Sequence, residues 1–267
     1  MAETKTKGLS SSFIKTIALI CMFTDHFAVS ILTQFIYNPS HPIMQKIGES
    51  IGVSNPAEMV QRITDIYQWM RNVGRISFPI YCFFIVEGFF HTRSRKKYAR
   101  RLAACALLSE IPFDLALYGK IVYIGHQNVF FTLLIGLLAI WSMDMILMNT
   151  DRTKGQKAVL SIPAMLGFLL CAELLFVDYS SFGVATILVM FLIRKFVADK
   201  VKLWAPLAHG AGIALLCILS LNEVWAFLGL PFMFFYRGKK GWNAKWFFYF
   251  FYPVHLMILA VLACFCR

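Results

Sequence analysis

An aspartate and a histidine stand next to each other, as Asp25 and His26, inside the first long apolar segment of the chain, residues 13–37. An ionised side chain at the centre of a bilayer costs about 2.5 to 3.5 kcal/mol on insertion scales, so it usually faces a protein interior and has a task there. An imidazole can act as a general base or as a nucleophile. The pair is therefore a candidate catalytic site. A histidine held in the core by a hydrogen bond is the structural alternative.

Lys15 precedes His26 by eleven residues. At 3.6 residues per turn, this spacing places the two side chains about 20° apart around a helix and about 16 Å apart along its axis. One helix face would therefore carry a cation near its start and an imidazole near the middle of the membrane. Asp25 points about 100° away from His26, so it could orient the imidazole through a neighbour or accept a charge from Arg75.

Arg75 lies four residues before Pro79 in the apolar segment 72–90. Because proline has no N–H to donate to the carbonyl of residue 75, the helix is loosened where it presents Arg75, and this predicts a polar pocket. Glu87 lies toward the other end of the same segment. It is a candidate substrate contact, or an ordinary partner for the basic residues that follow.

The densest cationic run of the chain spans residues 91–101. Its lysines and arginines are Arg93, Arg95, Lys96, Lys97, Arg100 and Arg101. Arginine binds phosphate oxygens through a planar fork, so the run is a candidate phosphate site. A topology anchor that binds anionic lipid is equally consistent with such a run.

Glu110 and Asp114 lie one helical turn apart in the segment 100–118, with Pro112 between them. They share a face, and two unpaired carboxylates would be costly within a membrane span. Arg75 or a histidine is their expected partner, or else one of the two carboxyl groups has a raised pKa. A packing clamp between Glu110 and Arg75 explains the pattern as well as a catalytic role does.

Tyr252 and His255 lie three residues apart in the last apolar segment, beside Pro253. This spacing puts them on one helix face and predicts a second histidine near the middle of the membrane. The seven cysteines lie in apolar segments without CxxC spacing, so they predict neither a disulfide framework nor a metal site.

The composition predicts an all-α, polytopic membrane protein. Hydrophobic residues make up 59% of the chain and charged residues only 15%, which is more apolar surface than a soluble domain can bury. The apolar runs are continuous and near 20 residues long, which favours helices over a β-barrel. Nine spans are expected: 13–37, 72–90, 100–118, 128–148, 158–177, 180–197, 203–221, 222–236 and 246–266.

The positions of lysine and arginine predict that the N-terminus is cytoplasmic. With nine spans, 20 of the 26 basic residues fall on the cytoplasmic side and Arg75 lies inside a span. The outer side keeps Lys46, Arg62, Arg71, Lys120 and Arg267. The net charge of +12 is thus mainly a topology signal, and no nucleic-acid partner is expected.

The longest connection, residues 38–71, is expected on the outer side, with turns at His41-Pro42 and Asn55-Pro56 and an interfacial helix at 57–70. It could serve as a lid or a docking element for an acceptor, or be a solvated connector. No internal repeat is found, so one domain over residues 1–267 is expected.

Several of these phrases, taken together and in order, resemble the TraX family. They are the stretch from Lys15 to Asp25-His26, Gly74-Arg75-Ile-Ser-Phe-Pro79, Glu87-Gly88-Phe89, Tyr98-Ala-Arg100-Arg101-Leu, Ser109-Glu110-Ile-Pro112-Phe-Asp114 and Tyr252-Pro253-Val-His255. The family is named for membrane acetyltransferases implicated in acetylation of the pilin N-terminus. It is similar to the wider transmembrane acyltransferases, in which a basic residue also lies eleven positions before a histidine.

The resemblance implies an acyltransferase of the bacterial plasma membrane that takes an acetyl group from cytoplasmic acetyl-CoA to an amine or hydroxyl acceptor. It implies catalytic roles for His26, Asp25, Arg75 and Glu110, with His26 as a general base or as the carrier of a transient acetyl group. The donor phosphates would contact Lys15, Arg93, Arg95, Lys97, Arg100 and Arg101. The acceptor, a peptide or glycan that the motifs do not identify, would contact His255, Tyr252, Asp114 and Glu87.

Two other classes of protein fit the same buried polar residues. A proton-coupled transporter also combines buried acids, histidines and arginines with proline-broken helices, although this chain lacks the inverted repeat that many transporters have. A structural membrane subunit uses polar side chains to join helices. It does not explain why Asp25, His26 and Arg75 occur together.

Overall fold

The computed structural model describes residues 8–53, 55–243 and 245–266, and the regular elements in these ranges are helices. In chain order they are α1 (Ser11–Phe27), the π-helical turn η1 (Ala28–Leu32), α2 (Thr33–Tyr37), α3 (Pro42–Ile51), α4 (Pro56–Gly74), α5 (Ser77–His91), α6 (Arg95–Tyr118), α7 (Val129–Met148), α8 (Lys154–Leu174), α9 (Ser180–Phe196), α10 (Trp204–Leu219), the 3-10 helix η2 (Leu221–Gly229), α11 (Leu230–Phe235) and α12 (Lys245–Cys266). The basic residues Lys5, Lys7 and Arg267 of the topology argument lie outside the described residues.

Five helical stretches among the described residues are long and apolar enough to cross a bilayer: 11–37, 56–91, 129–148, 154–174 and 245–266. Two shorter apolar helices, Trp204–Ile218 and Leu221–Phe235, accompany them. The chain is therefore an all-helical protein of the membrane type, as its composition predicts. The count of nine spans and the cytoplasmic N-terminus stay predictions.

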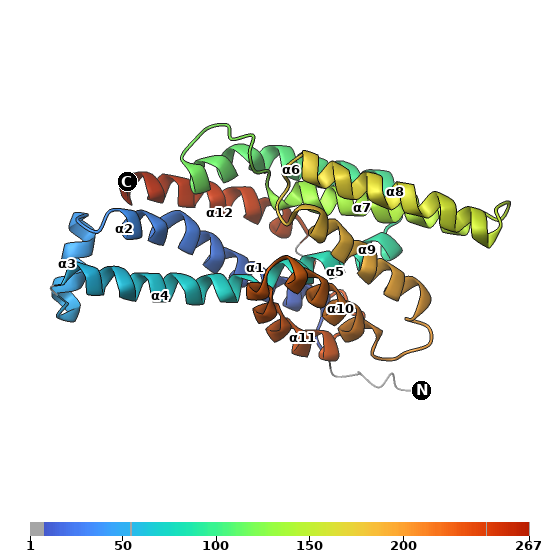
Figure 1. Cartoon of the computed structure of the whole chain (residues 1–267). Coiled ribbons are helices and arrows are strands. Elements are labelled where there is room, and N and C mark those ends of the chain that lie inside the picture. Colours follow the sequence, from blue (N-terminus) through green and yellow to red (C-terminus); the bar gives the residue numbers. More distant parts are fainter. Residues whose placement is uncertain (1–7, 54, 244, 267) are drawn as a thin grey trace.

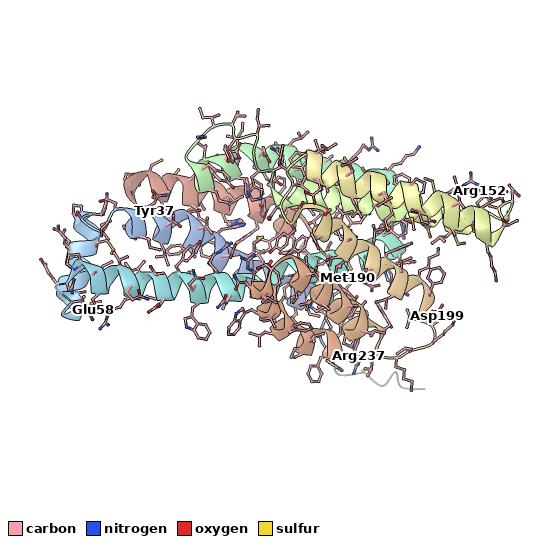
Figure 2. All side chains as sticks on the ribbon, in the orientation of Figure 1. Tyr37, Glu58, Arg152, Met190, Asp199 and Arg237 are labelled. Carbon is pink, nitrogen blue, oxygen red and sulfur yellow. The ribbon has the colours of Figure 1, made fainter. Side chains whose placement is uncertain are left out.

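The helices form two hairpin-like arms that extend in opposite directions from a shared centre (Figure 1). One arm contains α1–η1–α2 and α4, joined at its tip by α3, and the other contains the α7–α8 hairpin. Tyr37 and Glu58 lie at the end of the first arm, and Arg152 lies at the opposite end of the molecule (Figure 2). α12 packs against α6 and also contacts α1, η1 and α2.

α5 is the buried helix at the centre. It packs against α1, α7, α9 and α10. Ile80, Cys82, Phe83, Val86 and Phe89 are almost completely buried. A helix that is apolar all round must be shielded from water, and in α5 the neighbouring helices provide that shielding.

α8 shows the opposite pattern, since its apolar side chains are largely exposed. Val159, Ile162, Leu166, Leu170 and Leu174 each expose more than half of their surface. Leucine, isoleucine and valine are favourable in hydrocarbon, so we interpret this face as lipid-facing.

The expected 38–71 connection is mostly helical, which corrects the predicted start of the second span at residue 72. Asn55 caps α4 by accepting a hydrogen bond from the Ala57 N–H, and Pro56 occupies the first turn, where its missing N–H has no cost. α4 packs along α1, and only residues 75 and 76 separate it from α5. The 57–70 helix is therefore present, but it forms one continuous arm with the span that follows.

Candidate active site

His26 on α1 and His255 on α12 form a hydrogen-bonded pair, although 229 residues separate them in sequence. Nδ1 of His26 lies 2.8 Å from Nε2 of His255. The two rings are stacked, with centroids 5.1 Å apart and planes 7° apart. The structure thus brings together the two histidines that the sequence singled out.

The hydrogen bonds also assign the tautomers of the pair. Nδ1 of His255 lies 2.8 Å from the carbonyl oxygen of Phe251 and must donate to it, because a carbonyl only accepts. Nε2 of a neutral His255 then carries a lone pair and accepts from Nδ1–H of His26. Nε2 of a neutral His26 is therefore unprotonated, which is the state that a general base or a nucleophile requires.

Tyr252 completes the wall around the histidine pair. Its ring packs edge-on against His26, with centroids 5.6 Å apart, and against Phe130 of α7, with centroids 5.0 Å apart. Tyr252 and His255 are both 3% exposed. The spacing of these two residues on α12 correctly predicts that they share a face.

Asp25 pairs with Arg71, and this corrects the expected pairing with Arg75. Oδ2 of Asp25 accepts from Nη1 of Arg71 at 2.7 Å, and the two side chains are 20% and 24% exposed. Arg71 lies on α4, which is helical where the sequence analysis expected the end of a connection. Gly74 faces Asp25 so closely that a Cβ atom there would overlap the aspartate side chain, so glycine permits α4 to approach α1.

Arg75 pairs with Glu223, a residue that the sequence analysis did not select. Nη1 of Arg75 lies 2.9 Å from Oε1 of Glu223, whose side chain is only 2% exposed. Glu223 is the single acid in the apolar segment 222–236, and that isolation was the available signal. A buried carboxylate needs such a partner, because an unpaired charge in the interior is very costly.

Glu110 and Asp114 hold the connection between α6 and α7, so the expected pairing of Glu110 with Arg75 is wrong. Oε2 of Glu110 accepts from the backbone N–H of Asn128 at 3.3 Å and from its side-chain amide. Oδ2 of Asp114 accepts from the Tyr123 N–H at 2.7 Å. Asn128 in turn caps α7 through the Phe130 N–H. Both acids thus bond to neighbouring backbone.

A cavity of about 520 Å³ opens between α1, α5, α6, α7 and α12. Lys15, Arg101, Lys240 and Lys245 line one part of it, and Met22, Val129, Phe130 and Tyr252 line another. Met22 lies one helical turn before His26, and Tyr252 contacts the His26 ring. The cavity therefore extends from a basic region to the wall of the histidine pair.

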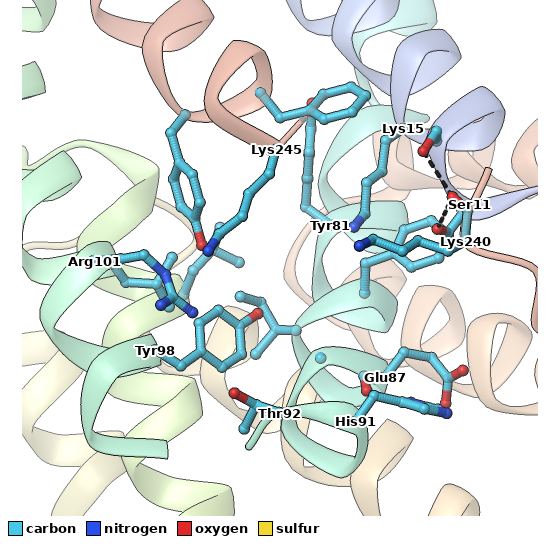
Figure 3. Close-up of a pocket in the computed structure, with 18 of the residues that line it drawn as sticks. Ser11, Lys15, Tyr81, Glu87, His91, Thr92, Tyr98, Arg101, Lys240 and Lys245 are labelled. Atoms are coloured by element: carbon cyan, nitrogen blue, oxygen red, sulfur yellow. Dashed lines mark hydrogen bonds between the residues drawn. The ribbon is translucent and has the colours of Figure 1, made fainter. Parts of the chain in front are cut away.

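The four cations of this cavity come from three separate segments. Figure 3 shows Lys15 and Lys240 on one side of the cavity and Arg101 and Lys245 on the other. None of the four makes an ion pair with an acid in the part of the chain that the structure describes. Lys15 instead places Nζ over the ring of Phe84, 4.7 Å from its centroid. Such an uncompensated cluster of positive charge favours an anionic ligand.

Only two of the predicted donor contacts, Lys15 and Arg101, line the cavity. Arg95 forms an ion pair with Asp144 at 2.8 Å. The remaining predicted contacts are not among the cavity-lining residues; they are Arg93, Lys97 and Arg100. Because α6 begins at Arg95, its basic residues point in different directions around the helix, and only Arg101 faces the cavity.

Lys240 and Lys245 were missed as site residues because the basic segment 237–245 was counted only as a topology signal. This segment is held against the start of α1, where Ser12 Oγ donates to the carbonyls of Lys240 at 2.7 Å and Trp242 at 2.8 Å. The Ser12 N–H also donates to the Lys240 carbonyl, at 3.1 Å. These bonds hold the basic segment at the cavity, which Lys240, Trp242 and Lys245 line.

Glu87, the last of the predicted contacts, is a buried member of the same region. Its carboxylate accepts from Nε of Arg194 at 2.8 Å and from the hydroxyl of Tyr236 at 3.1 Å. The expected pairing with the basic residues that follow it in sequence is not present. Instead Glu87 joins α5 to α9 and to the end of α11.

Comparison with known proteins gives one family and one curated relative. The model of the family described as TraX protein matches residues 10–263. A probable fimbrial assembly protein, FimC of serogroup H1, from Dichelobacter nodosus is 32% identical over 215 residues, which cover 72% of this chain and 82% of that protein. No solved structure matches the chain. Since the family model covers nearly the whole sequence, including every motif described above, the chain belongs to the TraX family.

Proposed function

We propose that this protein is an acyltransferase of the bacterial plasma membrane that transfers an acetyl group from cytoplasmic acetyl-CoA to an amine or hydroxyl acceptor. One observation supports this most strongly: a single cavity joins an uncompensated cation cluster to the wall of the His26–His255 pair. The name of the relative, a probable fimbrial assembly protein, favours a peptide over a glycan as acceptor.

In this proposal the phosphates of acetyl-CoA lie against Lys15, Arg101, Lys240 and Lys245. The narrow pantetheine arm then follows the aromatic and apolar walls of the cavity toward Tyr252, whose ring contacts His26, and this brings the thioester next to the histidine pair. Charge-assisted hydrogen bonds from lysine and arginine hold phosphate strongly where water is partly excluded.

Nε2 of His26 then removes a proton from the acceptor as its nitrogen or oxygen attacks the thioester carbonyl. The bond between carbonyl carbon and sulfur breaks, CoA leaves as the thiolate, and the proton passes from the imidazolium to the thiolate. General-base catalysis of this kind typically contributes about 10² to 10⁴ in rate. Attack by Nε2 itself, to give a transient acetyl-histidine, uses the same lone pair and is the second route.

Asp25 is a positioning residue in this proposal. Its ion pair with Arg71 fixes α4 against α1 one residue before His26. Arg75 is engaged by Glu223 through Nη1 and also hydrogen-bonds the Tyr179 side chain. Its buried Nε–H has no partner among the described residues and remains for the acceptor or for a developing oxyanion.

The test uses the protein purified in nanodiscs with acetyl-CoA that carries a deuterated acetyl group. A synthetic peptide with a free N-terminus serves as the acceptor probe, and mass spectrometry and release of the CoA thiol are the readouts. His26→Ala should lower acetyl transfer by about two or more orders of magnitude while CoA binding persists, because loss of the base affects the transition state more than the bound donor. His41→Ala is the matched control, because His41 is a partly exposed N-cap residue of α3 and lines neither the cavity nor the histidine pair.

Near-normal turnover in His26→Ala would overturn the mechanism. If the wild-type protein neither binds CoA nor releases its thiol, the acyltransferase proposal fails as a whole. Proton-driven solute uptake by vesicles containing the wild-type protein, lost in His26→Ala, would instead support the transporter alternative.

A further inference from the structure

A second, smaller cavity of about 330 Å³ lies beside the first. It is lined by Arg194 of α9, by Lys202 in the connection to α10, and by Arg237 after α11. The two cavities share lining residues, namely Glu87, His91, Tyr236 and Gly238. Glu87 and His91 appear together at the lower side of the close-up in Figure 3, which marks where the cavities adjoin.

The second cavity carries a net positive charge. Its only acid is Glu87, and that carboxylate is already occupied by Arg194 Nε and the Tyr236 hydroxyl. Lys202 forms no ion pair within the described residues. Arg237 donates Nη1 to the carbonyls of Phe234 and Tyr236, which orients its guanidinium and leaves its other donors available.

Two cation clusters on either side of a shared wall fit a ligand that carries two separate anionic groups. The Lys15 cluster faces a long cavity with aromatic walls, whereas the Arg237 and Lys202 cluster faces a short polar one. CoA has this distribution of charge, with a diphosphate between its pantetheine arm and its nucleoside and a further phosphate on the ribose 3′ oxygen. A donor with one phosphate, such as an acyl phosphate, would leave one cluster without a counter-charge.

We infer that the second cavity binds the ribose 3′-phosphate of CoA through Lys202 and Arg237. The first cavity then holds the diphosphate and the pantetheine arm, because it alone reaches Met22 and Tyr252 beside His26. This inference rests on the proposed function, and it names the part of the donor that the enzyme uses to distinguish CoA from pantetheine carriers.

The experiment measures binding of CoA and of 3′-dephospho-CoA by calorimetry to the protein in nanodiscs. The wild-type protein should bind CoA at least about tenfold more tightly, since a phosphate held by lysine and arginine makes charge-assisted hydrogen bonds. In the double variant Lys202→Ala/Arg237→Ala this preference should fall to about onefold, with the affinity for 3′-dephospho-CoA unchanged. The matched control is Lys200→Ala/Arg152→Ala, which removes two exposed cations that line neither cavity.

The two proposals fail in different ways. A double variant that keeps the full preference for CoA, or loses affinity for both ligands equally, would overturn the 3′-phosphate site while acetyl transfer by the wild-type protein still stood. A wild-type protein that binds neither ligand would contradict the acyltransferase proposal first. Loss of the preference in the control as well would show that general charge, and not this cavity, is responsible.

Discussion

His26 and His255 are both buried imidazoles, yet their hydrogen bonds give them different tasks. His255 donates to the Phe251 carbonyl, accepts from His26, and has no ring nitrogen left. His26 keeps Nε2 free of any hydrogen-bond partner among the described residues. The asymmetry arises because a helix carbonyl four residues before His255 is within reach of its ring. We therefore assign the reactive nitrogen to His26 and the supporting one to His255.

The first prediction concerns this division of tasks. His255→Ala should lower acetyl transfer by about fivefold, much less than His26→Ala, because it removes one hydrogen bond of about 1 kcal/mol that selects the tautomer of His26. His255→Gln should recover most of that loss, since the glutamine carbonyl oxygen can accept from Nδ1–H of His26. Turnover at saturating acetyl-CoA is the measurement. If His255→Ala were as inactive as His26→Ala and glutamine gave no recovery, the two assignments would have to be exchanged.

Single residues show clearly what the sequence could and could not predict. The spacing of the motifs identified His26, Tyr252 and His255, because a helical period of 3.6 residues predicts which positions of one helix lie on the same face. It could not select Arg71 over Arg75, since Arg75 follows Arg71 by one turn at the end of α4, and only the packing of α4 against α1 decides which of them meets Asp25. Partners between helices depend on tertiary packing, and local pattern does not contain it.

Among the elements, the connection between α6 and α7 is held by an unusual number of polar contacts. Nε2 of His126 lies 3.4 Å from Oδ1 of Asp178, and its Nδ1 lies 2.5 Å from the Tyr118 hydroxyl. The backbones of Gln127 and Asp178 also bond, with the Asp178 N–H donating to the Gln127 carbonyl at 3.0 Å. The connection is thus fastened to the turn before α9, and this fixes the start of α7, where Phe130 meets Tyr252.

This fastening should depend on pH. The hydrogen bond with Asp178 raises the pKa of His126 above its ordinary value of 6.5, while burial opposes the rise, and the carboxylates of Glu110 and Asp114 add to it. A raised pKa means that the protonated form stabilises the fold. The stabilisation of the fold by protonated His126 is complete below the ordinary pKa of histidine, and it is lost as pH rises through the raised pKa.

The second prediction therefore concerns hydrogen exchange of the Gln127 amide, which donates to the Phe176 carbonyl at 2.9 Å. Its protection factor should decline as pH rises above about 6.5, and His126→Gln should remove that decline. The protection factor is the right measure because intrinsic exchange also changes with pH. Constant protection across this range in the wild-type protein would contradict the assignment of the pKa to the Asp178 contact.

The helices themselves were largely predictable, and the exceptions have a common cause. The apolar runs at 128–148, 180–197 and 246–266 match α7, α9 and α12 to within about one residue. The polar stretch 55–71 was expected to contain only a surface helix, because its hydrophobicity is too low to indicate a span. It nevertheless forms α4, which packs on α1 and leads directly into α5 within the long helical stretch 56–91.

At the scale of the whole molecule, the distribution of basic residues bears on the orientation of the protein in the membrane. Lys240, Lys245 and Arg101 surround one cavity, and Lys15 lies at the start of α1 beside them. A cytoplasmic donor requires this end of the molecule to face the cytoplasm. The charge count predicts the same orientation independently of any ligand.

The third prediction tests that orientation. A reporter enzyme inserted between α5 and α6, near Ser94, should be active only in the cytoplasm, and one fused after residue 267 only outside it, as nine spans require. Cleavage of an engineered protease site in the α3 region by externally added protease is the supporting measurement. A cytoplasmic C-terminus would remove one span and reverse the depth assigned to His255.

Two sets of contacts determine when, during synthesis of the chain, the site can form. They are the bonds from Ser11 and Ser12 to residues 239–242 and the contact between His26 and His255. Each joins the first helix to the last part of the chain, across about 230 residues. Translation delivers α12 after the other described helices, so neither the part of the cavity lined by Lys240 and Lys245 nor the histidine pair exists until these residues have been synthesised. A chain that stops before α12 leaves His26 without its supporting imidazole and the cavity without Lys245. In the proposed mechanism, a chain without α12 therefore lacks groups that acetyl transfer requires.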